Sequence, residues 1–177
     1  MNESVAVMPF YDTFGRRLVA WAGVAGGDRV LDLGSSQGSV RLPALERVGA
    51  EGAVVGIDAT NAAQVELAGE SFDVVLCGLA LHVMVAPFRV LAEAYRVLRP
   101  GGTLAFSVPV PEAMTPPPPL DELAQRMGFT DPEYSFEEVH LLYDALDPFS
   151  RRRFRAQMQG GGSTMDASAL FVKLIRP

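Results

Sequence analysis

The sequence predicts an α/β fold, in which a doubly wound, mainly parallel sheet carries helices on both faces. Three short apolar runs suit buried strands: RVLDL (29–33), AVVGID (53–58) and SFDVVLC (71–77). Stripes of apolar residues at helical spacing lie between and after them, and the stripe over 87–98 stops at Pro100 and two glycines. Strands that alternate with helices indicate crossover connections, which give parallel pairing.

The first 110 residues hold the regular part of this pattern. A helix is expected over 12–24 with Asp12 as its N-cap, and a second over 39–48. A further strand should follow at 103–110, TLAFSVPV. A length of 177 residues favours a single domain, in which 1–110 would be the core part.

Beyond Val110 the pattern weakens. PEAMTPPPPL is expected to be a stiff connector and LDELAQRMGF a short helix. Two more helices are expected over SFEEVHLLYDAL (135–146) and PFSRRRFRAQM (148–158), so that 111–165 forms a helical segment. The final strand is expected within 166–177, where the sequence SALFVKLIRP ends the chain.

Charge and composition narrow the classes of function. Hydrophobic residues make up 49% of the chain and charged residues 20%, as in globular proteins. The net charge of −6 disfavours nucleic acid as a partner, because a sequence-independent binder needs a basic surface. The one dense basic cluster, Arg151–Arg155, is interpreted as a solvated helix face rather than a binding site for an anion.

Cysteine content and the distribution of apolar residues indicate the cellular compartment. Cys77 is the only cysteine, which excludes an intramolecular disulfide. The N-terminal residues lack the basic start and apolar core of a signal peptide, and no apolar run reaches the length of about eighteen residues that suggests a membrane span. We therefore expect a cytoplasmic protein without a membrane partner.

The sequence GSSQG (34–38), directly after the first strand, is the main candidate binding loop. Ligands of open parallel sheets bind at the carboxyl ends of the strands, where Gly34 permits a sharp turn and Gly38 a close helix start. Asp58 ends the second strand about twenty residues later, the spacing at which a carboxylate reaches a ribose diol. Alternatively, both glycines are only turn residues and Asp58 only caps a turn.

With this loop the chain resembles the class I S-adenosylmethionine-dependent methyltransferases, in their small-molecule branch. The likeness rests on VLDLGSSQGS, VVGIDAT, SFDVVLCGLALHVM and LAEAYRVLRPGGTLAFSVP, which come in the family's order over about residues 10–109. It implies a Rossmann-like sheet, S-adenosylmethionine as cofactor, no metal, and methyl transfer to a small organic acceptor of the kind found in secondary metabolism. It also implies that 111–165 covers the substrate.

The resemblance implies roles for individual residues. The loop after the first strand would hold the methionine portion of the cofactor, and Asp58 would take the ribose hydroxyls. The end of the third strand would line the floor beneath the sulfonium, and an N-terminal tyrosine would cover the cofactor. The implied cofactor-binding residues are Tyr11, Asp32, Gly34, Ser35, Ser36, Gly38, Asp58, Ala59, Cys77 and Gly78.

His82 is the candidate catalytic residue. It follows the third strand at a position where members of the family often face the substrate, whereas His140 is less well placed. A general base helps methyl transfer only when the acceptor must lose a proton. The alternative for His82 is a structural, partly buried histidine.

Two features depart from the family pattern. Ser36 stands where a glycine is expected, which adds a β-carbon close to the ligand, although its hydroxyl could donate to the cofactor carboxylate. Only Asn61–Glu70 connects the second and third strands, where relatives have a helix and a further strand. This stretch is expected to form a helix of about two turns or the stub of an edge strand. The sheet should therefore lack one edge strand, and the site should bind its cofactor less tightly or be wider.

Three functions remain open from the sequence. The first is methyl transfer; the second is a methyltransferase fold that no longer methylates and acts as a cyclase, an isomerase or a binding protein. The third, a nicotinamide-dependent oxidoreductase, shares the glycine loop but does not explain YRVLRPGG (95–102). An exposed second strand at the sheet edge would also allow a homodimer to form there.

Overall fold

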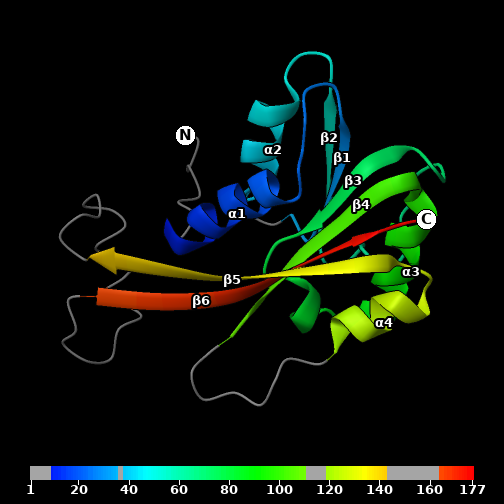
Figure 1. The fold of residues 1–177 in the computed structure, drawn as a ribbon. Helices are drawn as coiled ribbons and strands as arrows, with labels where there is room; N and C mark the ends of the chain where they lie inside the picture. Colours follow the sequence, from blue (N-terminus) through cyan, green and yellow to red (C-terminus); the bar gives the residue numbers. More distant parts are fainter. Residues whose placement is uncertain (1–8, 36–37, 111–118, 143–163) are drawn as a thin grey trace.

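The computed structural model describes residues 9–35, 38–110, 119–142 and 164–177. Its helices are α1 (Pro9–Trp21), α2 (Arg41–Val48), the 3-10 helix η1 (Leu81–Val83), α3 (Pro87–Val97) and α4 (Leu120–Arg126). Its strands are β1 (Arg29–Leu33), β2 (Ala53–Ile57), β3 (Phe72–Cys77), β4 (Leu98–Pro109), β5 (Thr130–Leu142) and β6 (Thr164–Ile175). In the described residues these strands form one sheet in the order β2-β1-β3-β4-β6-β5 (Figure 1).

Parallel pairing gathers three strand ends at one edge of the sheet. β1 pairs in parallel with β2 and β3, and β3 with β4, whereas β6 runs antiparallel to β4 and β5. In this register Asp32 of β1 lies between Gly56 of β2 and Leu76 of β3. The loops that follow β1, β2 and β3 therefore leave the sheet side by side, at the edge where such sheets bind ligands.

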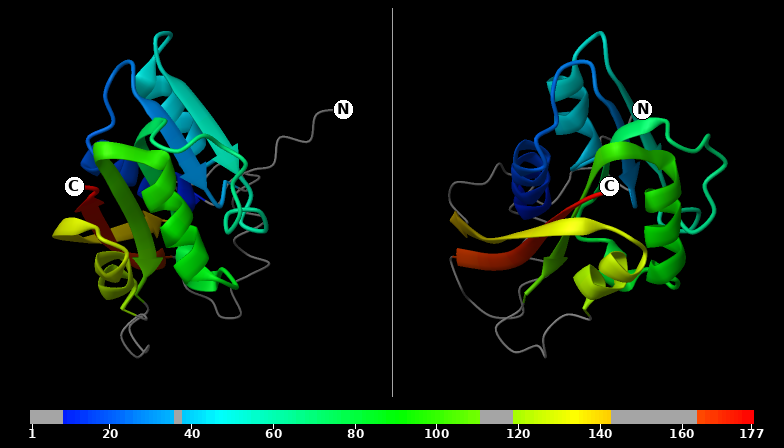
Figure 2. Two further views of the ribbon diagram at one scale, coloured as in Figure 1. Left: turned by 90° about the vertical axis from the view of Figure 1, so that its right-hand side faces the viewer. Right: turned by 45° about the vertical axis from the view of Figure 1, so that its right-hand side comes forward.

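Helices cover both faces of the sheet, as the sequence predicts (Figure 2). α1 and α2 pack on one face, around a core that includes Phe14 and Phe171. α3 and α4 pack on the other, around a core that includes Leu91 and Phe106. The central strands are buried on both sides, which explains why their sequences are continuous apolar runs rather than alternating ones.

The first helix begins earlier than its N-cap signal indicates. α1 starts at Pro9, so Asp12 lies in the first turn of the helix rather than at its N-cap. There it can still interact favourably with the helix dipole, and it forms an exposed ion pair with Arg16 at 3.5 Å. The prediction of a helix is confirmed, and its predicted start is wrong by about one turn.

The prediction of a helix over residues 135–146 is wrong where the structure describes them. Thr130–Leu142 form strand β5, which pairs with β6 along almost its whole length. Exposure alternates from Tyr134 onward, so that Phe136 and Glu138 face solvent while Val139 is buried. The apolar residues also fit a helical spacing, and pairing with β6 decides between the two because it satisfies the backbone of both strands.

The connection between β2 and β3, which we call the short crossover (residues 58–71), contains neither of the expected elements. Residues 61–70 form turns and bends instead of a two-turn helix or a strand stub. β2 pairs only with β1 in the described residues and ends the sheet on that side. The expectation of a sheet without a further strand beyond the second one is confirmed.

Several predictions lie outside the described residues. These include Ser36, the basic cluster Arg151–Arg155 and the helix expected over 148–158. Among the described residues, no helix is long and apolar enough to cross a membrane.

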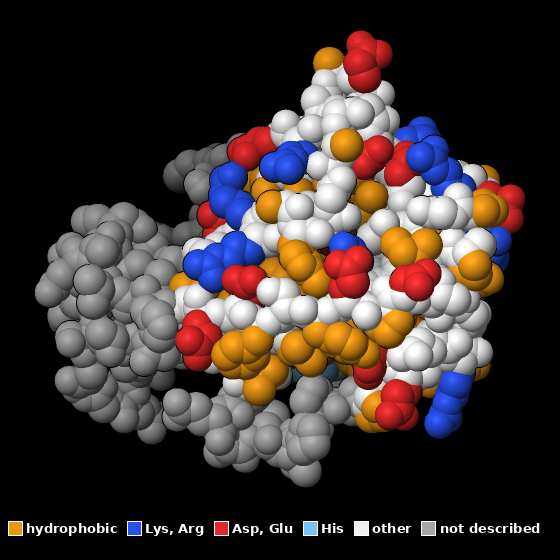
Figure 3. Space-filling view, in the orientation of Figure 1, with side chains coloured by type: hydrophobic (Ala, Val, Ile, Leu, Met, Phe, Trp, Pro, Cys, Tyr) orange, Lys and Arg blue, Asp and Glu red, His pale blue; other side chains and the backbone are white. Residues whose placement is uncertain are grey.

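Hydrophobic side chains form a row across the face of the molecule that carries β5 and β6 (Figure 3). On β5, Tyr134 and Phe136 keep 51% and 57% of their surface exposed.

Candidate functional site

The loop after β1 is attached to the end of β2. Gly34 adopts a φ of 86°, in the left-handed region that favours glycine, and the chain turns sharply there. The backbone N–H groups of Gly34 and Ser35 both donate to the carbonyl of Ile57, at 2.8 and 3.1 Å. Because Ile57 directly precedes Asp58, these bonds place the candidate loop beside the candidate ribose-binding acid.

Asp32 is buried at the end of β1 with an unsatisfied oxygen. Asp32 keeps only 2% of its surface exposed, and its Oδ2 atom has no hydrogen-bond partner in the described residues. Burial raises the pKa of Asp32 to about 6, and the Ser35 hydroxyl and the Arg41 charge oppose that rise. A buried carboxylate oxygen without a donor fits a ligand that brings one, such as an ammonium group.

Asp58 presents a carboxylate to solvent directly after β2. Thr60 donates its backbone N–H and its hydroxyl to Oδ1 of Asp58, both at 2.9 Å. These hydrogen bonds hold the pKa of Asp58 below its usual range. The group is therefore ionised and oriented, and a carboxylate with two oxygens can accept further donors such as hydroxyl groups.

The end of β3 forms the third side of the site. The Cys77 side chain is buried in the core on the α3 side, and burial raises the pKa of its thiol well above the usual range. Only the backbone around Cys77 and Gly78 can therefore face a ligand. Leu79 adopts a φ of 49° and donates its N–H to the buried hydroxyl of Ser107 at 3.0 Å, which fixes the turn.

Helix α1 packs directly on the loop. A β-carbon placed on Gly15 would lie 1.9 Å from the carbonyl oxygen of Ser39, so only glycine permits this approach. Gly38 has a φ of 81° and leads into α2 as predicted. α1 and the loop after β1 thus form one packed unit beside the sheet edge.

A cavity of about 200 Å³ lies between α1 and the turn after β3. Tyr11 lines it from α1, Leu79 and His82 from the turn, and Ser168 from β6. Tyr11 is 40% exposed and its ring lies against Phe10, with centroids 4.3 Å apart. The predicted covering residue and the predicted catalytic residue are therefore brought to one cavity.

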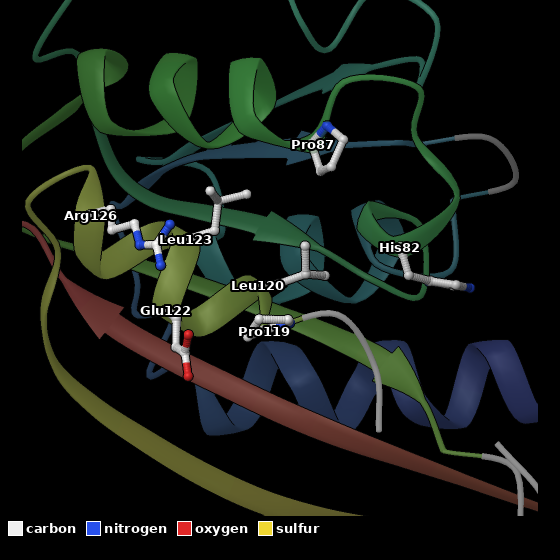
Figure 4. Close-up of a pocket in the computed structure, with 7 residues that line it drawn as sticks. All are labelled: His82, Pro87, Pro119, Leu120, Glu122, Leu123 and Arg126. Carbon is white, nitrogen blue, oxygen red and sulfur yellow. The ribbon is translucent and has the colours of Figure 1, made fainter. Parts of the chain in front are cut away.

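His82 also borders a second cavity of about 260 Å³ (Figure 4). This cavity is lined mainly by apolar side chains from α4 and the start of α3, with Glu122 and Arg126 also on its border. His82 is half-buried, its Nδ1 has no partner in the described residues, and burial lowers its pKa. The imidazole is therefore neutral near pH 7.

A third cavity, of about 550 Å³, lies beside the short crossover. Ile57 and Thr60, the residues that flank Asp58 and Ala59, line it together with Arg89 of α3. Ala59 is partly buried against the core. Cavities therefore lie on two sides of the candidate site, one beside the turn that contains Asp58 and two beside His82.

The residues at the ends of the first three strands are suited to bind S-adenosylmethionine. Asp32, Gly34, Ser35, Asp58 and Gly78 come together at the carboxyl edge of β1, β2 and β3. A buried acid with an unsatisfied oxygen and an exposed acid match the amine and the ribose of S-adenosylmethionine. No group of three or more metal-binding side chains occurs among the described residues.

Sequence reasoning missed three supporting residues. Thr60 orients Asp58, Ser107 fixes Leu79, and the charge of Arg41 acts on Asp32. The spacing of Asp58 and Thr60 is a known turn signature and could have identified Thr60. Ser107 and Arg41 depend on contacts between elements far apart in the sequence or on a helix start, so no local pattern marks them.

Comparison with known proteins finds similarity to methyltransferases. A profile described as "Methyltransferase domain" matches residues 44–106. An arsenite methyltransferase of Halobacterium salinarum is 35% identical over 121 residues, which cover 55% of this chain and 31% of that protein. The aklanonic acid methyltransferase DauC of a Streptomyces strain is 32% identical over 132 residues, which cover 61% and 60%.

Similarity in structure extends further than similarity in sequence. The crystal structure of an arsenic(III) S-adenosylmethionine methyltransferase from Chlamydomonas reinhardtii matches with a TM-score of 0.58 at 22% identity, covering 87% of this chain and 65% of that one. The chain spans less than two thirds of the length of both curated relatives. These matches support the resemblance found in the sequence: the chain is similar in sequence and in fold to class I S-adenosylmethionine-dependent methyltransferases.

Proposed function

We propose that this chain transfers a methyl group from S-adenosylmethionine to a small organic acceptor. The observation that carries the proposal is that two acids, Asp32 and Asp58, lie at the carboxyl ends of the neighbouring strands β1 and β2. Asp32 is buried with an unsatisfied oxygen, and Asp58 is exposed and oriented by Thr60. A fold kept for its shape alone has no need of the first arrangement, since it leaves a buried carboxylate oxygen without a donor in the described residues.

The residues of the chain would bind the cofactor, orient it and shield it from water. The bound cofactor supplies a methyl group that is already activated by a sulfonium. Asp58 accepts hydrogen bonds from the ribose hydroxyls, and Asp32 with the Gly34 turn holds the amine and carboxylate end. The backbone of Gly78 and Leu79 forms the floor, and Tyr11 helps to exclude water. Alignment and exclusion of water account for most of what such a site must do.

His82 is proposed to act on the acceptor. It borders the cavity beneath Tyr11 and the cavity beside α4, so an acceptor in either one lies near it. Its lowered pKa keeps the imidazole neutral near pH 7 and able to accept a proton. An acceptor that loses a proton on methylation would give that proton to His82.

The second candidate is a fold that binds but no longer methylates, as a cyclase, an isomerase or a binding protein. The short crossover favours it, because most of the residues that line the cavity of about 550 Å³ beside Thr60 lie in turns and bends of the crossover. A wider cavity holds the nucleoside end of a cofactor less firmly. The first candidate predicts that the chain binds S-adenosylmethionine and S-adenosylhomocysteine and converts the first into the second. The second candidate predicts no such conversion.

A calorimetric titration with S-adenosylmethionine and with S-adenosylhomocysteine tests the proposal. We expect both to bind with micromolar affinity, and methyl transfer from isotope-labelled S-adenosylmethionine to a member of a panel of small phenols, acids and thiols. Binding without transfer to any acceptor would favour the second candidate. The absence of binding at millimolar ligand would overturn the proposed function.

A further inference from the structure

The short crossover joins two parallel strands without regular secondary structure of its own. Such a connection normally contains a helix, whose internal hydrogen bonds satisfy its backbone. Here residues 61–70 form turns and bends, yet Ala62 and Val65 are buried, at 0% and 5% exposure. Buried backbone without internal pairing must find partners elsewhere.

Two side chains of α3 supply those partners. The Glu93 carboxylate accepts the N–H of Val65 at 3.2 Å, and the Arg96 guanidinium donates to the carbonyl of Val65 at 2.9 Å. Arg96 also donates to the carbonyl of Leu67 at 2.9 Å. Both backbone groups of Val65 are therefore paired by side chains, as a neighbouring strand would pair them.

Glu93 and Arg96 also hold each other in place. The guanidinium donates to both carboxylate oxygens, from Nε at 3.0 Å and from Nη2 at 2.8 Å. The pair lies three residues apart on α3, so one helix face carries both. In the described part of the chain, the hydrogen bonds that tie residues 61–67 to elements outside the crossover come from these two side chains alone.

The crossover held in this way begins at the candidate ribose-binding acid. Thr60, which fixes Oδ1 of Asp58, lies five residues before Val65, and both line the cavity of about 550 Å³. A crossover released from α3 would let the turn at Asp58–Thr60 move, and the carboxylate would lose its orientation. The anchoring pair and the ligand-binding acid are thus connected through one short segment of backbone.

We propose that Glu93 and Arg96 are positioning residues that fix the short crossover and, through Thr60, the carboxylate of Asp58 for binding the nucleoside end of the cofactor. This inference rests on the proposed function. The two residues touch no ligand themselves, and they stand in for the secondary structure that the crossover lacks. Charge-assisted hydrogen bonds to backbone groups are strong enough for this task, whereas an exposed ion pair alone is not.

The test uses the full chain with Arg96→Met, which keeps the aliphatic stem and removes the donors. We expect the dissociation constant for S-adenosylhomocysteine to rise about tenfold, as for the loss of one or two charge-assisted hydrogen bonds. Arg96→Lys should restore part of the affinity, because an ammonium can reach only some of the acceptors. Arg16→Met is the matched control, since it removes an exposed ion pair to Glu46 of the same 2.8 Å length.

Two readouts separate positioning from general stability. Hydrogen exchange at the Val65 amide should become faster in Arg96→Met and remain unchanged in Arg16→Met. In a double-mutant cycle, Arg96→Met should cost little further affinity once Asp58→Asn has been introduced, because both act through the same carboxylate. A purely structural residue would give additive losses.

The outcomes are distinct. Equal affinity losses in Arg96→Met and Arg16→Met, or additive losses in the cycle, would overturn the positioning role. If the unaltered chain binds no S-adenosylhomocysteine, the proposed function fails and the role toward the cofactor fails with it. Exchange at Val65 would then still show whether Glu93 and Arg96 hold the crossover.

Discussion

Thr60 donates two hydrogen bonds to one carboxylate oxygen of Asp58, from its backbone N–H and from its hydroxyl, each at 2.9 Å. A carboxylate that already accepts both donors on one side is held in a single orientation. Asp58 directly follows Ile57, whose carbonyl accepts the N–H groups of Gly34 and Ser35. Asp58 is thus presented as an oriented acceptor, although its side chain is exposed.

Asp58→Ala should weaken cofactor binding strongly. The variant removes the acceptor of two ribose hydroxyls, and we expect a loss of roughly 2–4 kcal/mol in binding free energy. Calorimetric titration with S-adenosylhomocysteine measures this loss. Glu51→Ala, which removes an exposed acid in the turn before β2, is the control and should bind as the unaltered chain does. Unchanged affinity in Asp58→Ala would show that the ribose lies elsewhere.

Asp32→Asn should stabilise the protein near neutral pH. The folded chain holds the Asp32 proton more tightly than the unfolded chain, since the pKa is raised from 3.8 to about 6. The contribution of Asp32 to stability therefore decreases as pH rises from about 4 to about 6, and it stays low above that range. A shift of about two pKa units corresponds to about 3 kcal/mol.

Urea denaturation at two pH values measures this effect. At pH 7.5 we expect Asp32→Asn to raise the free energy of unfolding by up to about 3 kcal/mol, and at pH 3.5 to leave it nearly unchanged. The same variant should bind S-adenosylhomocysteine more weakly, because the amine loses its anionic partner. A gain in stability of equal size at both pH values would contradict the burial of an ionised Asp32.

His82→Gln should lower kcat and leave cofactor affinity unchanged. Loss of a general base costs about 10²- to 10⁴-fold in rate when proton transfer limits the reaction. Because burial lowers the pKa of His82, the acid limb of the rate profile should lie below pH 6.5. Steady-state kinetics with an identified acceptor, from pH 5 to 8, provide the measurement. A rate profile that keeps its acid limb in His82→Gln would assign that limb to another group.

Gly15→Ala should destabilise the protein, although alanine is the better helix former. A β-carbon at Gly15 would lie 1.9 Å from the carbonyl oxygen of Ser39, which is backbone and cannot move aside as a side chain could. Overpacking of this kind costs about 1–3 kcal/mol. Gly26→Ala is the matched control, because nothing lies within 4 Å of a β-carbon there. Chemical denaturation of both variants distinguishes the contact from a general effect of adding a methyl group.

Much of the fold could be predicted from the sequence because its central strands are buried on both faces. Continuous apolar runs such as 29–33 and 72–77 indicate such strands directly, and helices with one apolar face must cover them. Strand β5 could not be predicted in the same way. Its sequence satisfies both a helical and an alternating spacing, and only β6, more than twenty residues later, decides between them.

Part of the candidate site could likewise be predicted from the sequence, and part could not. The glycine turn and Asp58 follow strands and could be placed from sequence spacing alone, whereas the burial of Asp32 depends on neighbours on both sides of β1. Cys77 shows the limit of transfer from a family. Its position at the end of β3 is as expected, but its side chain points into the core, so only backbone from this position can meet a ligand.

The anchoring of the short crossover has a consequence for the design of compact proteins. Removing a crossover helix from a doubly wound domain leaves buried backbone groups that need new partners. Here an acidic and a basic residue three positions apart on α3 pair both backbone groups of Val65, and no helix is needed. We expect that such a pair, introduced on the neighbouring helix of a related domain, would let its crossover be shortened in the same way.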